Sequence, residues 1–451
     1  MAIKQKNAVA FLNEAAGKII EASLCEVMGG YLALVQTEAG KRLAYVTEEE
    51  NQLTSLFKSE SVVDKGSAKI YIMPLNAHNA ALVRRIVKWT APSACGTKGL
   101  SLGFSDWLGA ADAFVTELFA KKQIKPVLVE YTPEDSIALK RNFLEAVDTA
   151  TWGVLEAGYR EGYGANAAGL KSEEEIVKAL LYGYSMIGFD CSDKIDLSIE
   201  KLSDESVAKK FNEFNETFKD AVNASYLNVE FQVGKDKISF TEAELHRIVL
   251  EFGEAIMHVQ FIYNSYLKNT PWDIDFELSL SKPGKALTPT EHYLIANELQ
   301  RNGIKLSSIC MDALKDGEAL NENLLLHCEI ADTFGYRISF ANADAGLEDP
   351  AAAIKALKGK AHLKLNNVTF CTGLGLVAEK NPELMGKVAA AIDLKPEDFT
   401  TNCKAFALGY KKILNPAEGN LAGEIKKVLQ ENREDYKNIL NTKVASIIKN
   451  L

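Results

Sequence analysis

Short, nearly continuous apolar runs recur along the chain from about residue 91 and alternate with segments of helical character. The seven runs span residues 100–104, 126–131, 185–190, 275–280, 306–311, 337–340 and 361–365. A strand covered on both faces has this pattern, whereas a strand covered on one face alternates apolar and polar residues. Seven alternating units predict an α/β fold, a TIM-like (β/α) barrel whose eighth strand the pattern does not locate. A doubly wound open sheet is the alternative.

Helix signals lie between these runs. Pro133 stands at the first position of a helix after Thr132, a favoured place for proline. Ser172 and Glu175 have the spacing of a capping box. The periodic segment 290–302 ends at Gly303, as helices commonly do.

Three further segments surround the predicted barrel or interrupt it. Residues 1–90 form a small N-terminal α/β domain, with strands at 31–35, 42–46 and 69–73 and a turn at Gly40. A helix-hairpin-helix insertion near 200–268 interrupts the barrel of residues 91–395. C-terminal helices of 396–451 pack on the barrel.

Composition narrows the class of protein but not its chemistry. The 451 residues are 47% hydrophobic and 25% charged, with a net charge of −10, which is typical of a globular protein and unlike a nucleic-acid-binding one. The chain has no apolar stretch of membrane-spanning length and no signal-type N-terminus, so we expect a cytoplasmic protein. The seven cysteines form no CxxC pair, which favours reduced thiols over disulfides or zinc.

Polar residues at the ends of the predicted strands are the candidates for chemistry, because barrel active sites lie at the carboxyl ends of the strands. His362 and Lys364 share a face of the last strand, since side chains two apart point the same way. Carboxylates at such ends serve as proton acceptors or ligate divalent metals. The candidates are Asp190, Glu277, Asp312, Asn342, His362 and Lys364.

One segment resembles a known family. Residues 148–167 read DTATWGVLEAGYREGYGANA, which is similar to the tagaturonate/fructuronate epimerase signature DDATWGVFQEGYxEGFGADA. Shorter stretches that resemble the family follow the same order along most of the chain. These stretches are residues 103–109, 189–193, 255–259, 276–280, 327–331 and 362–364.

The resemblance implies a barrel enzyme that inverts C4 of a keto-hexuronate with a divalent metal (Zn, Mn or Ni) as cofactor. Its proton-transfer glutamate matches Glu277, and we assign Asp190 as the second catalytic candidate. The substrate would be a small sugar or sugar acid, and a homo-oligomer is left open. We assign substrate binding to Asp106, His362, Lys364, Asn342 and Asp312.

Several positions depart from the family pattern. Ala168 and Gly169 stand in place of an acid and a histidine, and Ala341 in place of another histidine. Trp107 and Met311 replace arginines, and a family histidine aligns close to Ala407. A site that loses its ligating imidazoles does not bind metal tightly, so we expect no metal ligand here.

Three hypotheses follow from these departures. The first is a divergent homologue with most metal-binding and catalytic positions lost, which binds a sugar or sugar acid without catalysis or with altered activity and needs no cofactor. The second is an active epimerase or isomerase of keto-hexuronates or ketohexoses that works through Glu277 and a rearranged site. The third is the ordinary metal-dependent epimerase. A barrel mouth filled by Trp107, Met311 and Phe340 favours the first, and an open polar pocket centred on Glu277 favours the second.

Overall fold

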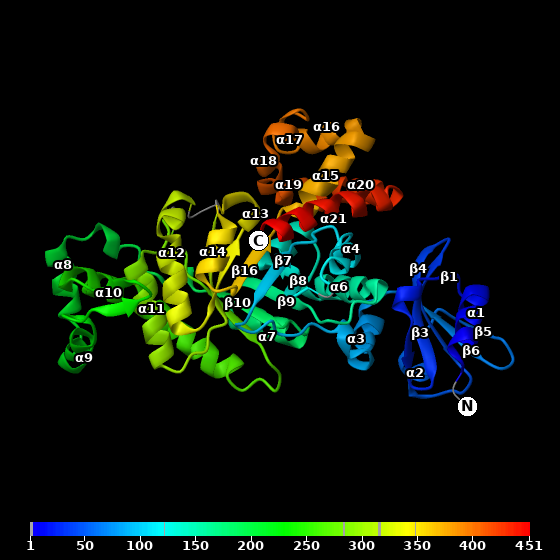
Figure 1. Ribbon diagram of the computed structural model, residues 1–451, viewed down its shortest axis with the longest axis horizontal. Coiled ribbons are helices and arrows are strands. Elements are labelled where there is room, and N and C mark those ends of the chain that lie inside the picture. The colour runs from blue at the N-terminus through cyan, green and yellow to red at the C-terminus, as the bar shows by residue number, and fades with distance from the viewer. Residues whose placement is uncertain (1–2, 121, 283–284, 314–316, 348) are drawn as a thin grey trace.

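The computed structural model describes residues 3–120, 122–282, 285–313, 317–347 and 349–451. Eight parallel strands close into a barrel, with β16 pairing with β7 to complete the ring (Figure 1). The strands are β7 (Leu100–Phe104), β8 (Ile124–Tyr131), β9 (Gly164–Leu170), β10 (Met186–Asp190), β13 (Asp275–Ser279), β14 (Ser308–Asp312), β15 (Arg337–Ala341) and β16 (Ala361–Leu365). The predicted (β/α) barrel is therefore confirmed, and the open sheet is not.

The strand that the apolar pattern does not locate is β9. Its sequence, GANAAGL, contains small residues and no β-branched side chain, so it has little strand propensity of its own. Its neighbours supply the pairing, because β9 is hydrogen-bonded to β8 on one side and to β10 on the other. Tertiary context therefore sets the conformation of β9.

Strand register decides which side chains enter the barrel. Glu277 lies level with Gly188 and Ser308 on the neighbouring strands, and Ser339 lies level with His362. Residues in register on neighbouring strands share a face, and alternate residues along a strand share it too. The polar strand residues therefore point into the barrel, and the apolar residues between them face the surrounding helices.

The N-terminal part is an antiparallel sheet. Its order is β1 (Lys18–Ile19), β3 (Gly30–Thr37), β4 (Gly40–Thr47), β6 (Lys69–Met73) and β5 (Ser61–Asp64), with β2 (Cys25–Val27) paired to β3. Helix α1 (Gln5–Ala15) packs on one face. The other face packs near α3 (Ala77–Ile86) and against Leu155 of α6 (Phe143–Ala157). The three predicted strands are confirmed here.

A helical segment with a short hairpin lies between β10 and β13. It contains α8 (Asp204–Phe211), α9 (Glu216–Tyr226), a short hairpin of β11 (Phe231–Val233) and β12 (Asp236–Ile238), and the long helix α10 (Glu242–Ile262). His246 on α10 stacks on Phe211 with ring centroids 3.6 Å apart, so it serves packing.

The C-terminal helices form a layer beside the carboxyl end of β7. Helix α15 (Val368–Lys380) packs against α16 (Pro382–Ala390), α20 (Leu421–Glu431) and α21 (Arg433–Asn450). Helix α21 also packs on α4 (Asp112–Glu117), which follows β7 (Figure 1). The helical layer therefore starts within the residues that follow β16, and the exact domain boundaries stay a prediction. No helix among the described residues is long and apolar enough to cross a membrane.

Candidate active site in the barrel

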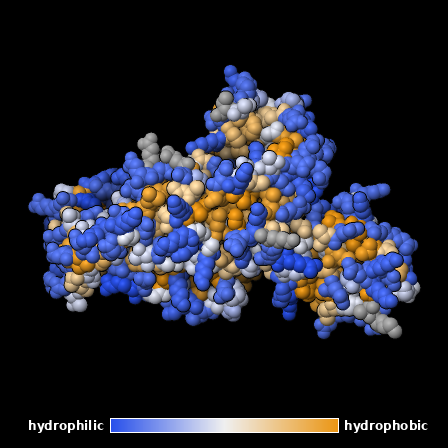
Figure 2. All heavy atoms as spheres, viewed as in Figure 1, coloured by the Kyte–Doolittle hydropathy of each residue, from blue (hydrophilic) through white to orange (hydrophobic). Residues whose placement is uncertain are grey.

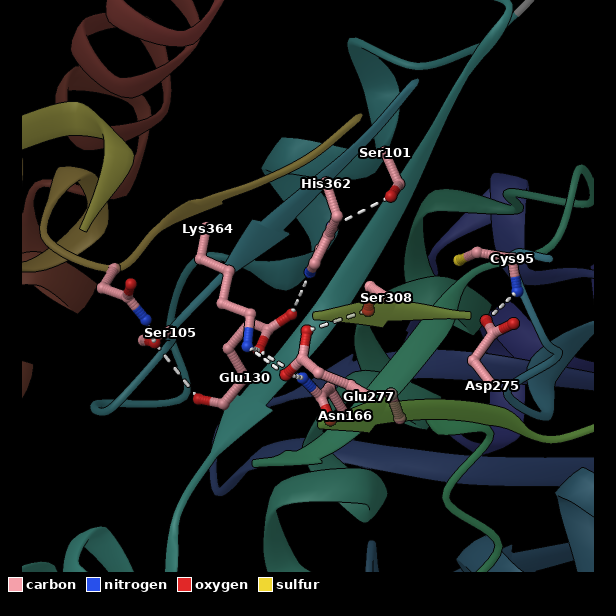
Figure 3. Close-up of polar contacts among 12 residues, drawn as sticks. Cys95, Ser101, Ser105, Glu130, Asn166, Asp275, Glu277, Ser308, His362 and Lys364 are labelled. Carbon is pink, nitrogen blue, oxygen red and sulfur yellow. Dashed lines mark hydrogen bonds and ion pairs between the residues drawn. The ribbon is translucent and has the colours of Figure 1, made fainter. Parts of the chain in front are cut away.

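The centre of the barrel holds a network of buried charged side chains (Figure 3). Lys364 Nζ lies 2.5 Å from Glu277 Oε1 and 3.6 Å from Glu130 Oε2. His362 Nε2 lies 2.7 Å from Glu130 Oε1. None of these four residues is more than 3% exposed. The network thus joins β8, β13 and β16 across the interior.

Ser101 and Glu130 hold the His362 ring from both sides. Arg337 Nη1 donates a hydrogen bond to Ser101 Oγ at 2.8 Å, and Ser101 Oγ lies 2.9 Å from His362 Nδ1. His362 therefore links Arg337 and Ser101 to the carboxylate of Glu130.

Two further side chains complete the network. Asn166 Nδ2 donates to Glu130 Oε2 at 2.9 Å and to Glu277 Oε1 at 3.2 Å. Ser308 Oγ donates to Glu277 Oε2 at 3.3 Å. Toward the other end of the barrel, Asp275 accepts hydrogen bonds from the backbone nitrogens of residues 95 and 96, at 2.5 and 2.9 Å. The carboxylates are thus satisfied by donors from several strands.

The ion pair fixes the charges of its members. Burial by itself raises the pKa of Glu277, but Lys364, His362 and Ser339 together outweigh burial and hold that pKa at about 2. Burial by itself lowers the pKa of Lys364, but Cys310, Glu277 and Glu130 outweigh it and raise that pKa well above its ordinary value. Lys364 is therefore a permanent cation and not a free amine for imine formation. Glu277 is a permanent anion, which makes it a poor proton donor.

Above this network, the rim of the barrel carries the other predicted residues. Asp190 ends β10 with its side chain 23% exposed, and its Oδ2 lies 3.8 Å from Lys171 Nζ. Its Oδ1 accepts hydrogen bonds from the backbone nitrogen of Ser192 at 3.0 Å and from the Ser192 hydroxyl at 2.5 Å. Asp190 therefore combines partial exposure with a fixed orientation, as a proton-exchanging carboxylate requires.

Asp312 and Asn342 lie together on the same rim. Asn342 Nδ2 donates to Asp312 Oδ1 at 3.0 Å, and its backbone nitrogen donates to Asn366 Oδ1 at 2.9 Å. Asn366 Nδ2 in turn donates to Ser105 Oγ at 2.9 Å. A chain of polar contacts thus follows the carboxyl ends of β14, β15, β16 and β7, where hydroxyl groups of a sugar could be recognised.

Asp106 takes a different place from the rest. Its carboxylate accepts hydrogen bonds from the backbone nitrogens of Ala110, Ala111 and Asp112 at 3.0, 2.6 and 3.3 Å. This arrangement satisfies free amides at the start of α4, as an N-terminal capping residue does. The structure therefore gives Asp106 an anchoring contact and does not bring it into the buried network.

The three large side chains expected to fill the mouth do not do so together. Met311 and Phe340 pair in register and alternate with the inward-pointing residues, so they face the outer helices. Trp107 stacks on Tyr410 of α19 (Tyr410–Ile413) with ring centroids 3.5 Å apart, and it meets Phe370 edge-on at 5.7 Å. Glu277, for its part, lies in a filled network and not in an open pocket. Neither sequence-based criterion matches the structure.

Comparison with known proteins assigns the chain to a family. The family model described as tagaturonate epimerase matches residues 20–451. The tagaturonate/fructuronate epimerase of Thermotoga maritima is 26% identical over 366 residues, which cover 79% of this chain and 74% of that protein. The chain belongs to the tagaturonate epimerase family.

Solved structures agree with this family. The native fructuronate-tagaturonate epimerase of Cohnella laeviribosi has a TM-score of 0.85 and 25% identity, over 99% of both chains. Its complex with two glycerol molecules has a TM-score of 0.86 at 25% identity, over 100% of this chain and 99% of that one. The resemblance inferred from residues 148–167 is thus confirmed, and it extends to the whole fold.

This family member does not present a metal-binding group in the described parts of the chain. Among these residues, no three His, Cys, Asp or Glu side chains lie together in an arrangement that could hold a metal ion. Ala168, Gly169 and Ala341 lie at the ends of β9 and β15 and supply no donor atom. Gly169 has a φ of +68°, a conformation that suits glycine. Among the described residues, the three positions that depart from the family pattern therefore offer no side-chain ligand for a divalent metal.

Sequence analysis missed five members of the network: Glu130, Asn166 and Arg337, and the hydroxyl groups of Ser101 and Ser308. Glu130 and Arg337 are charged residues inside apolar runs, and a charge in a strand covered on both faces is itself a signal, because burying it demands a partner. Asn166 could not be placed without β9. By contrast, Glu277, His362 and Lys364 were named from the sequence, and the structure brings them together.

Proposed function

We propose that this chain is an active epimerase or isomerase of keto-hexuronates or ketohexoses, working at the mouth of the barrel. The observation that carries the proposal is the buried network of Glu130, Glu277, His362 and Lys364. Barrel interiors are usually filled by branched aliphatic side chains, and buried ion pairs are often no more stabilising than such residues. Charges held at this cost under a barrel mouth are a functional-site signature.

The proposed chemistry uses the permanent cation. C4 of a 2-ketose lies two carbons from its ketone, so its inversion can proceed by a retro-aldol route: the C4 hydroxyl gives up its proton, the C3–C4 bond breaks to an aldehyde and an enolate, and the bond re-forms on the other face of the aldehyde. This route develops negative charge on an enolate oxygen, which a pre-oriented cation stabilises. Lys364 supplies that positive charge, and Glu277 and Glu130 are positioning residues that hold its ammonium group.

The rim residues are proposed to handle the substrate. Asp190 is the partly exposed carboxylate that exchanges a proton with the substrate, and Asp312 and Asn342 bind its hydroxyl groups. His362 acts through Glu130 and not by direct contact. Asp106 is proposed to support substrate binding indirectly, because it anchors the turn at the start of α4. A sugar-acid substrate and a cytoplasmic location both remain predictions.

A second candidate function is binding without turnover. One observation favours it: Glu277 and Lys364 neutralise each other, and Ala168 and Ala341 on the rim bear no acid or base. Such a protein would bind the sugar acid and leave it unchanged.

The test is an assay of the full chain with four substrates: tagaturonate, fructuronate, tagatose and fructose. Each is incubated with and without Zn²⁺, Mn²⁺ or Ni²⁺, and products are resolved by chromatography. We expect interconversion within the uronate pair, within the hexose pair, or within both. Asp190→Asn should lower kcat by at least tenfold, because it removes the proton acceptor.

Lys178→Met is the matched control for this assay. Lys178 lies on α7 (Glu173–Leu181), outside the barrel, in an exposed pair with Glu174. The Lys178→Met variant should turn over the substrates at the same rate as the wild type. A folded wild-type chain that binds a uronate but converts none of the four substrates under any condition would contradict the first proposal and support the second.

A further inference from the structure

A cavity of about 530 Å³ lies away from the barrel interior, where three parts of the chain meet. The N-terminal sheet contributes Lys41, the outer helix α6 contributes Trp152 and Glu156, and α20 and α21 contribute Lys426 and Arg433. In Figure 1 the blue sheet lies beside α6 and the red helices lie above α4. Figure 2 shows the outline of the molecule narrowing between these regions. The volume is within the range of small-molecule sites.

Cations outnumber their partners in this cavity. Glu156 is shared, with Oε2 paired to Lys41 and Oε1 paired to Arg433. Lys426 also lines the cavity, and it makes no hydrogen bond or ion pair with any other described residue. Within the cavity lining, Glu156 thus pairs with two of the three positive groups, and Asp106 attracts Lys426 without an ion pair.

A second carboxyl group in the lining does not cancel this surplus. Asp112, which begins α4, lines the same cavity and is only 5% exposed. Burial raises the pKa of its carboxyl group well above the ordinary value, and nearby Asp106 adds to the effect. Burial lowers the pKa values of Lys41 and Lys426, and Glu156 and Asp106 respectively oppose that effect. The surplus therefore rests on the geometry of the cations, and an anion that enters the cavity would add a partner for them.

The apolar part of the cavity lining suits the carbon skeleton of an organic ligand. Trp152, Leu75 and Leu429 line the cavity together with the cations. An indole ring offers a flat apolar surface, and lysine and arginine are the usual partners of carboxylate and phosphate oxygens. We propose that this cavity binds a small organic anion, which carries a carboxylate or phosphate group on a body of sugar size. This site is separate from the barrel mouth and does not depend on the proposed function.

Bound there, the anion would join three parts of the chain. Its oxygens would meet Lys426 of α20 and Arg433 of α21 near one end of the chain and Lys41 of β4 near the other. A ligand that binds only the folded chain stabilises it by mass action. The melting temperature should therefore rise with the concentration of the anion.

The experiment is calorimetric titration of the full chain with three probes: inorganic phosphate, D-galacturonate and the neutral match D-galactose. We expect at least one anion to bind and galactose not to bind in the cavity. Lys426→Met should weaken anion binding about tenfold, because a charge-assisted contact is lost while the apolar stem is kept. Binding of phosphate alone indicates a phosphate ester, and binding of galacturonate alone indicates a sugar acid.

Two controls keep the result specific. Lys427→Met alters the neighbouring residue on α20, whose side chain is 74% exposed and pairs with Glu431, so it should bind the anion as the wild type does. Lys178→Met, on the outer helix α7, should also leave this binding unchanged. The proposal is overturned if neither anion binds, or if Lys426→Met and Lys427→Met bind equally well. Loss of turnover alone would bear only on the barrel site.

Discussion

The barrel interior and the cavity under α20 both place lysines beside glutamates, but they differ in how the charges are matched. In the barrel, Lys364 lies between Glu130 and Glu277, and Arg337 and His362 are tied into the same network. In the cavity, Lys41 and Arg433 share Glu156, and among the described residues Lys426 has no hydrogen bond or ion pair and only the longer-range attraction of Asp106. A matched network sets orientation and charge inside the protein, whereas an unmatched one attracts charge from outside.

The largest effect should come from breaking the matched network. Lys364→Met leaves two buried carboxylates without their cation, so we expect the free energy of unfolding to fall by about 3–5 kcal/mol. Urea denaturation measures it. The double variant Glu277→Gln/Lys364→Met removes both charges and should lose clearly less. Equal losses in the single and double variants would mean that the pair is not coupled.

Acid should weaken the same network. The pKa of Glu277 is about 2 in the folded chain, against an ordinary value of 4.5. A lowered folded-state pKa gives stability that is complete above the unfolded-state value and is lost as pH falls toward 2. Between pH 4.5 and 2, the wild type should therefore lose on the order of 3 kcal/mol more than Glu277→Gln. Parallel losses in the two proteins, measured by urea denaturation at each pH, would contradict the assigned ion pair.

In the cavity, removing the Glu156 carboxylate should strengthen the binding of anions. Glu156→Gln takes away the group that compensates Lys41 and Arg433, so anions should bind about three- to tenfold more tightly. Stability should fall by only about 1 kcal/mol, because the pairs are partly solvent-exposed. Calorimetry with phosphate or galacturonate checks the affinity. Weaker anion binding in Glu156→Gln would show that Glu156, and not the cations, organises the site.

The smallest effect is expected at Lys41. Because Lys41 is already paired with Glu156, Lys41→Gln should weaken anion binding about threefold, less than Lys426→Met does. The two variants are compared in the same titration. A larger loss for Lys41→Gln than for Lys426→Met would reverse the ranking drawn from their partners.

The sequence reveals the barrel because strands covered on both faces keep a near-continuous apolar pattern. It fails at β9, where Ala and Gly residues adopt strand geometry only because β8 and β10 flank them. The grouping of Glu277, His362 and Lys364 is predictable from strand ends, face-sharing and family resemblance. The role of Glu130 is not predictable, because its carboxylate meets His362 and Lys364 on another strand only when the barrel closes.

The cavity lies beyond sequence analysis for a different reason. Lys41, Glu156 and Arg433 are separated by more than a hundred residues at each step and belong to segments whose docking no local pattern specifies. Trp107 illustrates the same limit. Trp107 stacks on Tyr410, and this contact depends on where the C-terminal helices pack. The strand pattern alone therefore does not predict whether Trp107 fills the barrel mouth.

The most direct test of the central claim is a time course of tagaturonate and fructuronate interconversion, followed by proton NMR. The wild-type chain and the double variant Glu277→Gln/Lys364→Met, which leaves no unpaired member of that ion pair, are compared after both are shown to be folded. We predict that the wild type converts the uronates and that the double variant is slowed at least a hundredfold, because the cation facing the enolate is gone. Equal rates in the two proteins would contradict the role assigned to the buried network.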